Sequence, residues 1–150
     1  MNSDTSGSDT FSHHIGRLLQ RAHRDYAQRA ISKLRASGYA DLAQFQAELL
    51  SEIATHGERI SAIAKKLGMS KQAAGETVGQ LEKMGFLTKI PDTTDSRATL
   101  VELTPQGQQF IEKVRGIKKE LDRDYIAHLG DHDFDTLRKI LEKLLSGTDS

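Results

Sequence analysis

Hydrophobic residues in the first third of the chain recur at steps of three and four, the period of an amphipathic helix. The pattern predicts a long helix from Phe11 to Arg35, ended by Ser37 and Gly38 with glycine as the left-handed cap. Its apolar stripe is Ile15, Leu18, Leu19, Ala22, Tyr26, Ala30, Ile31 and Leu34. A second helix is predicted from Asp41, as N-cap, to about Thr55, and its buried residues are expected to be Leu42, Phe45, Leu49, Leu50 and Ile53.

Two shorter helices with a tight connection are predicted next. Ser61 is the expected cap of a helix over residues 62–67, and Ser70 caps another that Gly85 ends. Gly68 and Met69 form the turn between them. Alternation of β-branched or apolar residues with polar ones then predicts strands over residues 86–90 and 98–103, joined by the polar loop 91–97.

The last part of the chain is predicted to be helical again. Thr104 and Pro105 have the cap-then-proline order of a helix start, and Gly130 is expected to end that helix. Its stripe is Phe110, Val114, Ile117, Leu121 and Tyr125. Asp131 or Asp133 caps a final helix that buries Phe134, Leu137, Ile140, Leu141, Leu144 and Leu145. The order α-α-α-α-β-β-α-α indicates a mainly α protein built around a winged helix-turn-helix.

The composition fits one domain of a polar globular protein. The 150 residues are 37% hydrophobic and 28% charged, and no apolar run is long enough to span a bilayer. Residues 1–10 are rich in Ser, Thr, Asp and Gly, which predicts a disordered tail and a cytoplasmic protein. The absence of cysteine excludes disulfides and thiolate zinc sites. The net charge is zero, so any surface that binds phosphate must arise from local placement of charge.

The middle of the chain resembles the MarR family of bacterial regulators. The resemblance is carried by residues 59–64 (RISAIA), 70–72 (SKQ), 80–86 (QLEKMGF) and 95–107 (DSRATLVELTPQG). The combination of an L-E-x-x-G helix end with a D-x-R…L-T-x-x-G wing is specific, whereas either piece alone is weak. Residues 57–107 match best, and the flanking helices agree in number and order, so residues 11–150 are expected to form a single MarR-like domain, with the winged helix-turn-helix at 57–103.

The helix over residues 70–84 is the expected reader of DNA. Ala74, Thr77, Val78 and Leu81 share one face and are expected to pack inward. The outward face and the N-terminal end carry Ser70, Lys71, Gln72, Gly75, Glu76 and Gly79. The Gln72 amide can bond adenine in the major groove, Lys71 suits guanine or phosphate, and Ser70 suits phosphate. Glu76 can accept from cytosine, and the two glycines let the backbone approach DNA; alternatively, Gln72 and Glu76 are solvated side chains and the glycines are tolerated weak spots.

The wing carries a second expected contact. The family resemblance implies that Arg97 reaches the minor groove or its phosphates while Asp95 orients the guanidinium. Many family members have a basic residue where this chain has Ser96, so Lys89 is expected to share this contact. The alternative is a surface ion pair that only stiffens the hairpin and contributes about 0–1 kcal/mol.

The outer helices, residues 11–36 and 104–146, are expected to form a dimer interface. Their apolar stripes exceed what a winged helix can cover, and two-fold pairing would bury them. The interface residues are predicted to be Ile15, Leu18, Leu19, Ala22, Leu137, Ile140, Leu141 and Leu144. The resemblance implies interlocked helices that hold two reading helices about 34 Å apart, on a palindromic operator. The alternative is that these stripes pack within one monomer.

The resemblance also implies a repressor with a small aromatic or anionic effector, bound between the helical part and the DNA-binding part. His23 and Tyr26 are weak candidates for that pocket. The six histidines, at positions 13, 14, 23, 56, 128 and 132, match no zinc spacing, so no metal or other cofactor is expected. No catalytic motif is present, and we expect no enzyme. The alternatives are a winged-helix protein-docking module and a metal-responsive regulator.

Overall fold

The computed structural model describes residues 14–53 and 56–147, and its chain divides into two compact units. One unit comprises residues 34–116, and the other combines residues 1–33 with 117–150. The predicted disordered tail, residues 1–10, and the predicted helix start at Phe11 lie outside the described residues. None of the helices in the described part of the chain has the length and apolar character that a membrane crossing requires.

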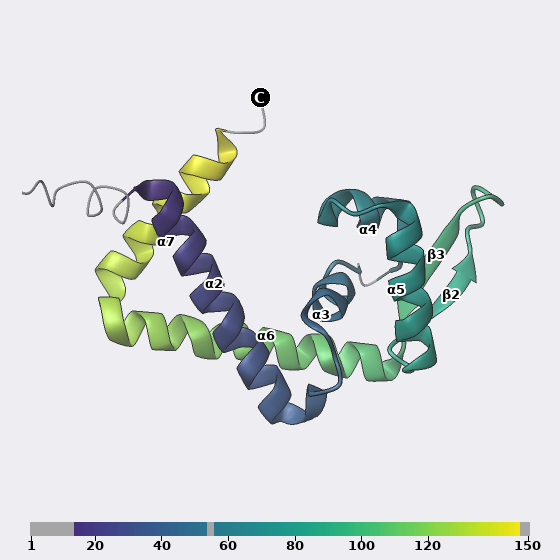
Figure 1. Ribbon diagram of the computed structural model, residues 1–150, viewed down its shortest axis with the longest axis horizontal. Helices are drawn as coiled ribbons and strands as arrows, with labels where there is room; N and C mark the ends of the chain where they lie inside the picture. The colour runs from purple at the N-terminus through teal and green to yellow at the C-terminus, as the bar shows by residue number, and fades with distance from the viewer. Residues whose placement is uncertain (1–13, 54–55, 148–150) are drawn as a thin grey trace, which may run out of the picture. The chain divides into compact units, whose positions relative to one another are not determined.

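The structure is mainly helical with one small sheet, as predicted (Figure 1). The elements in chain order are α2 (Ile15–Leu34), the π-helical turn η1 (Arg35–Tyr39), α3 (Gln44–Ser51), β1 (Glu58–Arg59), α4 (Ile60–Leu67), α5 (Lys71–Lys83), β2 (Leu87–Pro91), β3 (Thr99–Leu103), α6 (Pro105–Leu129) and α7 (Asp131–Ser146). Gly38 ends α2 in the left-handed region, at φ 97°, as predicted.

The sheet has three antiparallel strands in the order β1-β3-β2, one more strand than predicted. β2 and β3 form the wing hairpin, with Leu87 opposite Leu103 and Pro91 opposite Thr99. β1 pairs Arg59 with Leu100 on the other side of β3. Two charged residues carry no hydrophobic period, and therefore the sequence pattern does not predict β1.

The helix-turn-helix consists of α4 and α5, which pack against each other within residues 34–116 (Figure 1). Gly68 makes the turn at φ 63°, and the Ser70 side chain accepts the Ala73 N–H at 3.1 Å, so Ser70 is the predicted cap. The prediction of Ser61 as the cap of α4 is wrong, because α4 begins at Ile60 with Arg59 as N-cap. The pairing of β1 with β3 already holds Arg59 in the extended conformation that an N-cap needs.

The second predicted helix is shorter than expected and presents a different face. α3 begins after Ala43 rather than Asp41, and it ends at Ser51. Leu42, Leu49, Leu50 and Ile53 are buried as predicted, whereas Phe45 is 50% exposed, so its predicted burial is wrong. Gln46 occupies the inward position instead, because its amide accepts from Ala43 N–H and donates to Gln80 Oε1, both at 3.0 Å. An amide with a hydrogen bond at both its oxygen and its nitrogen can be buried at this place without a large penalty.

The end of α5 and the start of α6 are bonded to each other. Thr104 Oγ1 donates to the Gly85 carbonyl at 2.5 Å and accepts from Gly107 N–H at 3.2 Å. The Thr104 N–H donates to the Phe86 carbonyl at 3.1 Å. Gly107 is buried against that same carbonyl, and any Cβ at position 107 would collide with it. The L-E-x-x-G and L-T-x-x-G segments are therefore two halves of one junction.

The base of the wing is held by a buried carboxylate. Asp92 has 4% of its side chain exposed, and its Oδ1 accepts from Thr94 N–H at 2.8 Å and Thr94 Oγ1–H at 2.7 Å. Asp92 Oδ2 lies 2.6 Å from Arg59 Nη2, which also donates to Thr94 Oγ1 at 3.1 Å. The Thr94 bonds and the Arg59 charge lower the pKa of Asp92 to about 2. This set of contacts, the wing tether, fastens the wing loop to β1.

The other unit contains α7, most of α2 and the second half of α6. Ile117 and Leu121 of α6 are buried there. The rings of Tyr26 and Tyr125 stack at 6.4 Å, and Tyr125 Oη donates to Asp25 Oδ2 at 3.1 Å. Gly130 is the N-cap of α7, so neither Asp131 nor Asp133 caps this helix as predicted; both lie in its first turn, where their charge favours the helix dipole.

We expect Gly107→Ala to lower the free energy of unfolding by about 1–3 kcal/mol, because the new methyl group overpacks the junction against the Phe86 carbonyl. Gly116→Ala is the matched control, since it lies on the same helix with no atom within 4 Å of a Cβ. That control should raise stability by about 0.5–1 kcal/mol, as Gly→Ala does inside helices. Urea denaturation measures both, and an equal change in the two variants would contradict the close-packed junction.

We expect the wing tether to make stability dependent on pH in acid. The folded pKa of Asp92 lies below its ordinary value of 3.8, so its stabilising contribution is complete above about pH 4. The contribution should disappear as the pH falls from about 4 to about 2. The stability difference between the wild type and Asp92→Asn should therefore shrink across that range when urea midpoints are compared. A difference that stays constant from about pH 5 to about pH 2 would contradict the tether.

Candidate nucleic-acid interface

The outward face of α5 is unobstructed. Ala74, Thr77, Val78 and Leu81 are buried, as predicted, and Gln72 and Glu76 on the opposite face are exposed. A Cβ added at Gly75 or Gly79 would meet no atom within 4 Å. Packing inside this chain therefore does not require glycine at either position, although each glycine destabilises the helix by about 1 kcal/mol relative to alanine.

The side chains near the start of α5 already have partners. The Ser70 hydroxyl accepts the Ala73 N–H, which leaves its own O–H to donate. Gln72 Nε2 donates to Glu76 Oε1 at 3.4 Å, a long and weak bond on an exposed surface. The Gln72 amide must leave Glu76 to bond a base edge with both of its polar atoms. Glu76 is thus placed to orient Gln72 in the unbound protein.

The tip of the wing carries a highly exposed arginine. Arg97 has 92% of its side chain exposed, and its Nε lies 3.6 Å from Asp95 Oδ1. The same Asp95 oxygen accepts the Arg97 backbone N–H at 3.0 Å, which stiffens the turn. Lys89 on β2 is held by Glu82 of α5, which accepts its N–H at 3.0 Å and lies 3.8 Å from Nζ. Lys89 therefore links the wing to α5, and it does not lie with Arg97 and Asp95 in the cleft described next.

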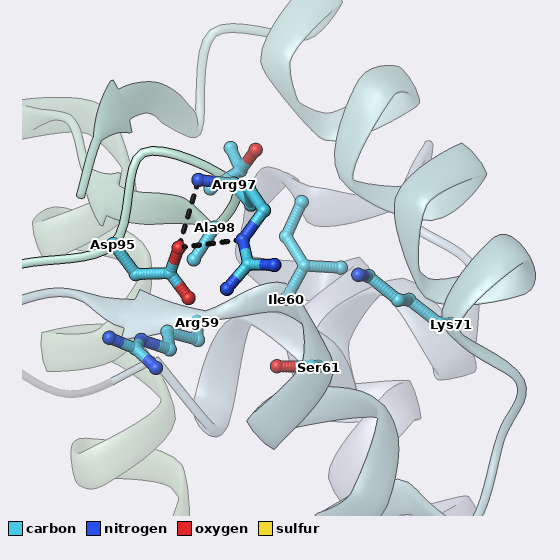
Figure 2. A pocket seen from close by; sticks show the side chains of 8 residues that line it. Arg59, Ile60, Ser61, Lys71, Asp95, Arg97 and Ala98 are labelled. Atoms are coloured by element: carbon cyan, nitrogen blue, oxygen red, sulfur yellow. Dashed lines mark hydrogen bonds and ion pairs between the residues drawn. The ribbon is translucent and has the colours of Figure 1, made fainter.

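Three of the predicted DNA-binding residues line one cleft with five residues that were not predicted to bind DNA (Figure 2). The cleft has a volume of about 360 Å³, and its walls are formed by Arg59, Ile60, Ser61, Lys71, Asp95, Arg97, Ala98 and Thr99. Lys71, Asp95 and Arg97 were predicted, whereas Arg59 and Ser61 were not. Gln72, Glu76 and Lys89 do not line this cleft.

The sequence contained a signal for one part of the wing tether, the turn formed by Asp92 and Thr94. An Asp followed two residues later by Thr, directly after Pro91, is typical of a turn in which the carboxylate accepts the second N–H. The structure contains that turn, through Asp92 and Thr94. The ion pair of Asp92 with Arg59 had no such signal, because 33 positions separate the two residues in the chain and only the sheet brings them together.

The two lysines near β1, Lys66 and Lys71, differ in whether a carboxylate neutralises them. Glu58 lies 3.0 Å from Lys66 Nζ, and the bond from Lys66 is the main cause that lowers the pKa of Glu58. Lys71, by contrast, takes part in none of the ion pairs found in the described residues. Lys71 is therefore a cation in the cleft that carries no carboxylate partner within the described part of the chain.

The predicted dimerisation residues are largely exposed within the unit of residues 1–33 and 117–150. The large apolar residues exposed there are Ile15, Leu18, Leu19, Leu129, Leu137, Ile140, Leu144 and Leu145. Ala22 is also exposed, and Leu141 is half-buried. Leu137, Ile140, Leu144 and Leu145, which the last helix was expected to bury, are thus not covered within the single chain. These residues line α7 at helical spacing and leave an apolar stripe uncovered.

The weak effector candidates differ in their surroundings. His23 is exposed on α2. Tyr26 is half-buried by its stack on Tyr125, and burial together with the charge of Asp122 raises its pKa. In the described residues, no group of three or more His, Asp or Glu side chains is arranged to hold a metal ion. His13, one of the histidines considered above, lies outside the described residues.

Comparison with known proteins agrees with this geometry. Residues 42–99, from before α3 to the start of β3, match the model of the MarR family. The chain is 26% identical over 135 residues to the transcriptional repressor MprA of Escherichia coli (strain K12), covering 90% of this chain and 77% of MprA. Two other curated relatives, from Thauera aromatica and Bacillus subtilis (strain 168), are 29% and 28% identical, and the chain spans 51% and 63% of their lengths.

Solved structures show the same fold. Wild-type MarR from E. coli, in the apo form, superposes with a TM-score of 0.74 at 22% identity, over 87% of this chain and 96% of MarR. MepR of S. aureus, in its DNA complex, superposes with a TM-score of 0.70 at 21% identity, over 89% of this chain and 97% of MepR. The order of the elements and the fold are therefore those of winged-helix proteins of the MarR type, and residues 42–99 of the chain are similar to the MarR family of transcriptional regulators.

Proposed function

We propose that this chain is a sequence-specific DNA-binding repressor that binds a palindromic operator as a homodimer. The observation that carries the proposal is the unobstructed outward face of α5 beside an almost fully exposed wing arginine. A major groove about 12 Å wide admits one helix, and α5 can enter it without displacing any other part of its own unit. The solved complex of MepR with DNA is a precedent for this use of the fold.

The residues of α5 divide by chemistry into base readers and phosphate binders. Gln72 offers a donor and an acceptor that match adenine, and Glu76 holds this amide near the groove-facing surface before DNA arrives. Ser70 and Lys71, at the end of the helix, suit the DNA backbone. Gly75 and Gly79 place no side chain on the outer surface of α5, so its backbone can lie close to the bases.

Dimer formation follows from the exposed apolar stripe of α7 and the apolar residues of α2. Burial of one leucine or isoleucine side chain stabilises an interface by about 1.5–3 kcal/mol, so several such residues together supply a strong driving force. A two-fold axis is the usual way for one chain to cover its own apolar stripe. Two copies of α5 would then face successive major-groove segments of one palindrome.

The proposal includes a small aromatic or anionic effector that releases the protein from DNA. Such a molecule must bind the DNA-free form more tightly than the DNA-bound form, since equal affinity for both shifts no equilibrium. His23 and Tyr26 stay the candidate contacts. MprA carries the name of a repressor, and we propose repression on that precedent.

We expect Gln72→Ala and Arg97→Ala to weaken DNA binding in different ways. Gln72→Ala should cost about 1–3 kcal/mol on the operator and relax preference at one base pair per half-site, with little change in salt dependence. Arg97→Ala should weaken operator and random DNA alike and flatten the log–log salt slope by about one per lost contact. Fluorescence anisotropy on operator and scrambled duplexes at several salt concentrations measures both effects.

The matched controls for this experiment are Gln109→Ala and Arg115→Ala, exposed residues on α6 outside the interface. Neither control should change affinity or salt slope. The two roles would be reversed if Gln72→Ala altered the salt slope while Arg97→Ala only relaxed base preference. Unchanged DNA binding in both variants would favour the protein-docking module instead.

We expect Ile140→Glu together with Leu144→Glu to convert a dimer into a monomer. Both residues are at least half exposed, and a buried unpaired carboxylate at each position would oppose association. Lys143→Glu, an exposed position on the same helix, should leave the dimer intact. Sedimentation velocity reports the mass, and circular dichroism checks that the helices persist. A wild-type chain that is monomeric at micromolar concentration, or a double variant that stays dimeric, would contradict the proposed interface.

A further inference from the structure

The cleft between the wing and the helix-turn-helix gathers cations from separate elements. Arg59 comes from β1, Lys71 from the first residue of α5, and Arg97 from the loop between β2 and β3. Figure 2 shows the Arg97 and Lys71 side chains extending toward each other across Ile60, with Ser61 below. Asp95 is the one carboxylate among the residues that line the cleft, and it lies beside Arg97. Such a lining favours an anion.

Arg59 is held by Asp92 and Thr94 and still has donors left for a further acceptor. Its Nη2 is the atom that contacts Asp92 and Thr94 among the described residues, so Nε and Nη1 keep their donors for another acceptor. The side chain is 42% exposed, although the carboxylate behind it is buried. An arginine held at one end of its guanidinium loses less conformational entropy when it binds a second oxyanion.

The position of the cleft identifies the anion. It lies between α5, which the proposed function places in the major groove, and the wing, which that function places at the minor groove. The two grooves of a duplex are separated by a sugar–phosphate backbone. When both elements contact DNA, one backbone strand has to pass between them, and the cleft is the concave surface there. Its cations then face phosphate oxygens.

We propose that the cleft binds one backbone phosphate per half-site, with Arg59 as its principal ligand and with Ser61, Lys71 and Arg97 around it. Asp92 and Thr94 are positioning residues that hold the Arg59 guanidinium toward the phosphate. This inference rests on the proposed function, because the phosphate belongs to bound DNA. It adds a contact from β1 that the helix-turn-helix motif and the wing arginine do not predict.

The test uses the full-length chain and a duplex that the wild type selects from a random pool. Arg59→Gln removes the phosphate ligand and also leaves Asp92 buried without its cation. The double variant Arg59→Gln with Asp92→Asn removes both charges, so the base of the wing is neutral again. Lys113→Gln, an exposed lysine on α6 that does not line the cleft, is the control for loss of one positive charge.

Affinity is measured against salt concentration, and then on duplexes with a neutral methylphosphonate at one backbone position at a time. Thermal unfolding of each variant separates folding from binding. We expect the double variant to recover stability relative to Arg59→Gln but to stay about tenfold weaker on DNA, as loss of a charged hydrogen bond implies. Its salt slope should be flatter by about two, one for each half-site of a dimer.

The methylphosphonate scan assigns the contact. At one position per half-site, neutralising the phosphate should weaken wild type and Lys113→Gln alike, yet have a clearly smaller effect on the Arg59 variants, which keep only Lys71 and Arg97 as cations of the cleft. The phosphate site is overturned if the double variant regains both stability and affinity, because Arg59 then serves only the wing. It is also overturned if the Arg59 variants respond to every methylphosphonate as the wild type does. A wild type that selects no duplex defeats the proposed function itself, which is a different result.

Discussion

The junction between the end of α5 and the start of α6 is the constraint on which the DNA-binding unit depends. Thr104 bonds the Gly85 carbonyl with its side chain and the Phe86 carbonyl with its N–H. The first turn of α6 lies so close to Phe86 that position 107 admits only glycine. The wing hairpin begins directly after Phe86 and ends directly before Thr104, so both of its ends are fixed at this junction. The junction therefore closes the loop from α5 through β2 and β3 to α6, and it sets where the wing stands relative to the reading helix. Phe110, one turn further along α6, is fully buried and packs edge-on against Phe86 and Tyr39, which supports the junction from below.

A chain with no net charge can still present a surface for DNA, because its carboxylates are placed beside the candidate contacts. Asp92 lies beside Arg59, Asp95 beside Arg97, Glu82 beside Lys89 and Glu76 beside Gln72. Apart from the buried Asp92, these carboxylates are at least partly exposed, so their bonds contribute little to stability and are exchanged easily for DNA oxygens or base edges. They orient the donors in the unbound protein. Asp92 differs, because its carboxylate is buried and its charge is compensated by Arg59. We expect that pair to keep the wing joined to β1 when DNA is bound.

The helical unit has the opposite chemistry. Its α7 and the first turns of α2 leave large apolar side chains exposed, while ion pairs such as Arg138–Asp135 and the Tyr125–Asp25 bond occupy other positions of the same helices and of α6. Apolar surface left uncovered by its own chain is the physical reason for the proposed association, which would place assembly and DNA contact in different units. In the proposed dimer, a mutation could then alter assembly without any change of the residues proposed to contact DNA.

Much of this protein is determined by local sequence. The inward face of α5, the glycine ends of α2 and α5, the Ser70 cap and the wing hairpin follow from helical period, alternation and cap chemistry, each of which acts over a few residues. The tertiary structure alone decided the rest. β1 exists because β3 offers it a partner, Phe45 is exposed because Gln46 finds Gln80 on another helix, and Arg59 becomes a candidate ligand because Asp92 holds it. The exposure of the α7 stripe is also a tertiary outcome, since the period of its leucines says that one face is apolar but not which molecule covers it. For β1, Phe45 and Arg59 the deciding partner lies far away along the chain, and for the α7 stripe the chain itself offers no cover, so no local pattern carries information about either.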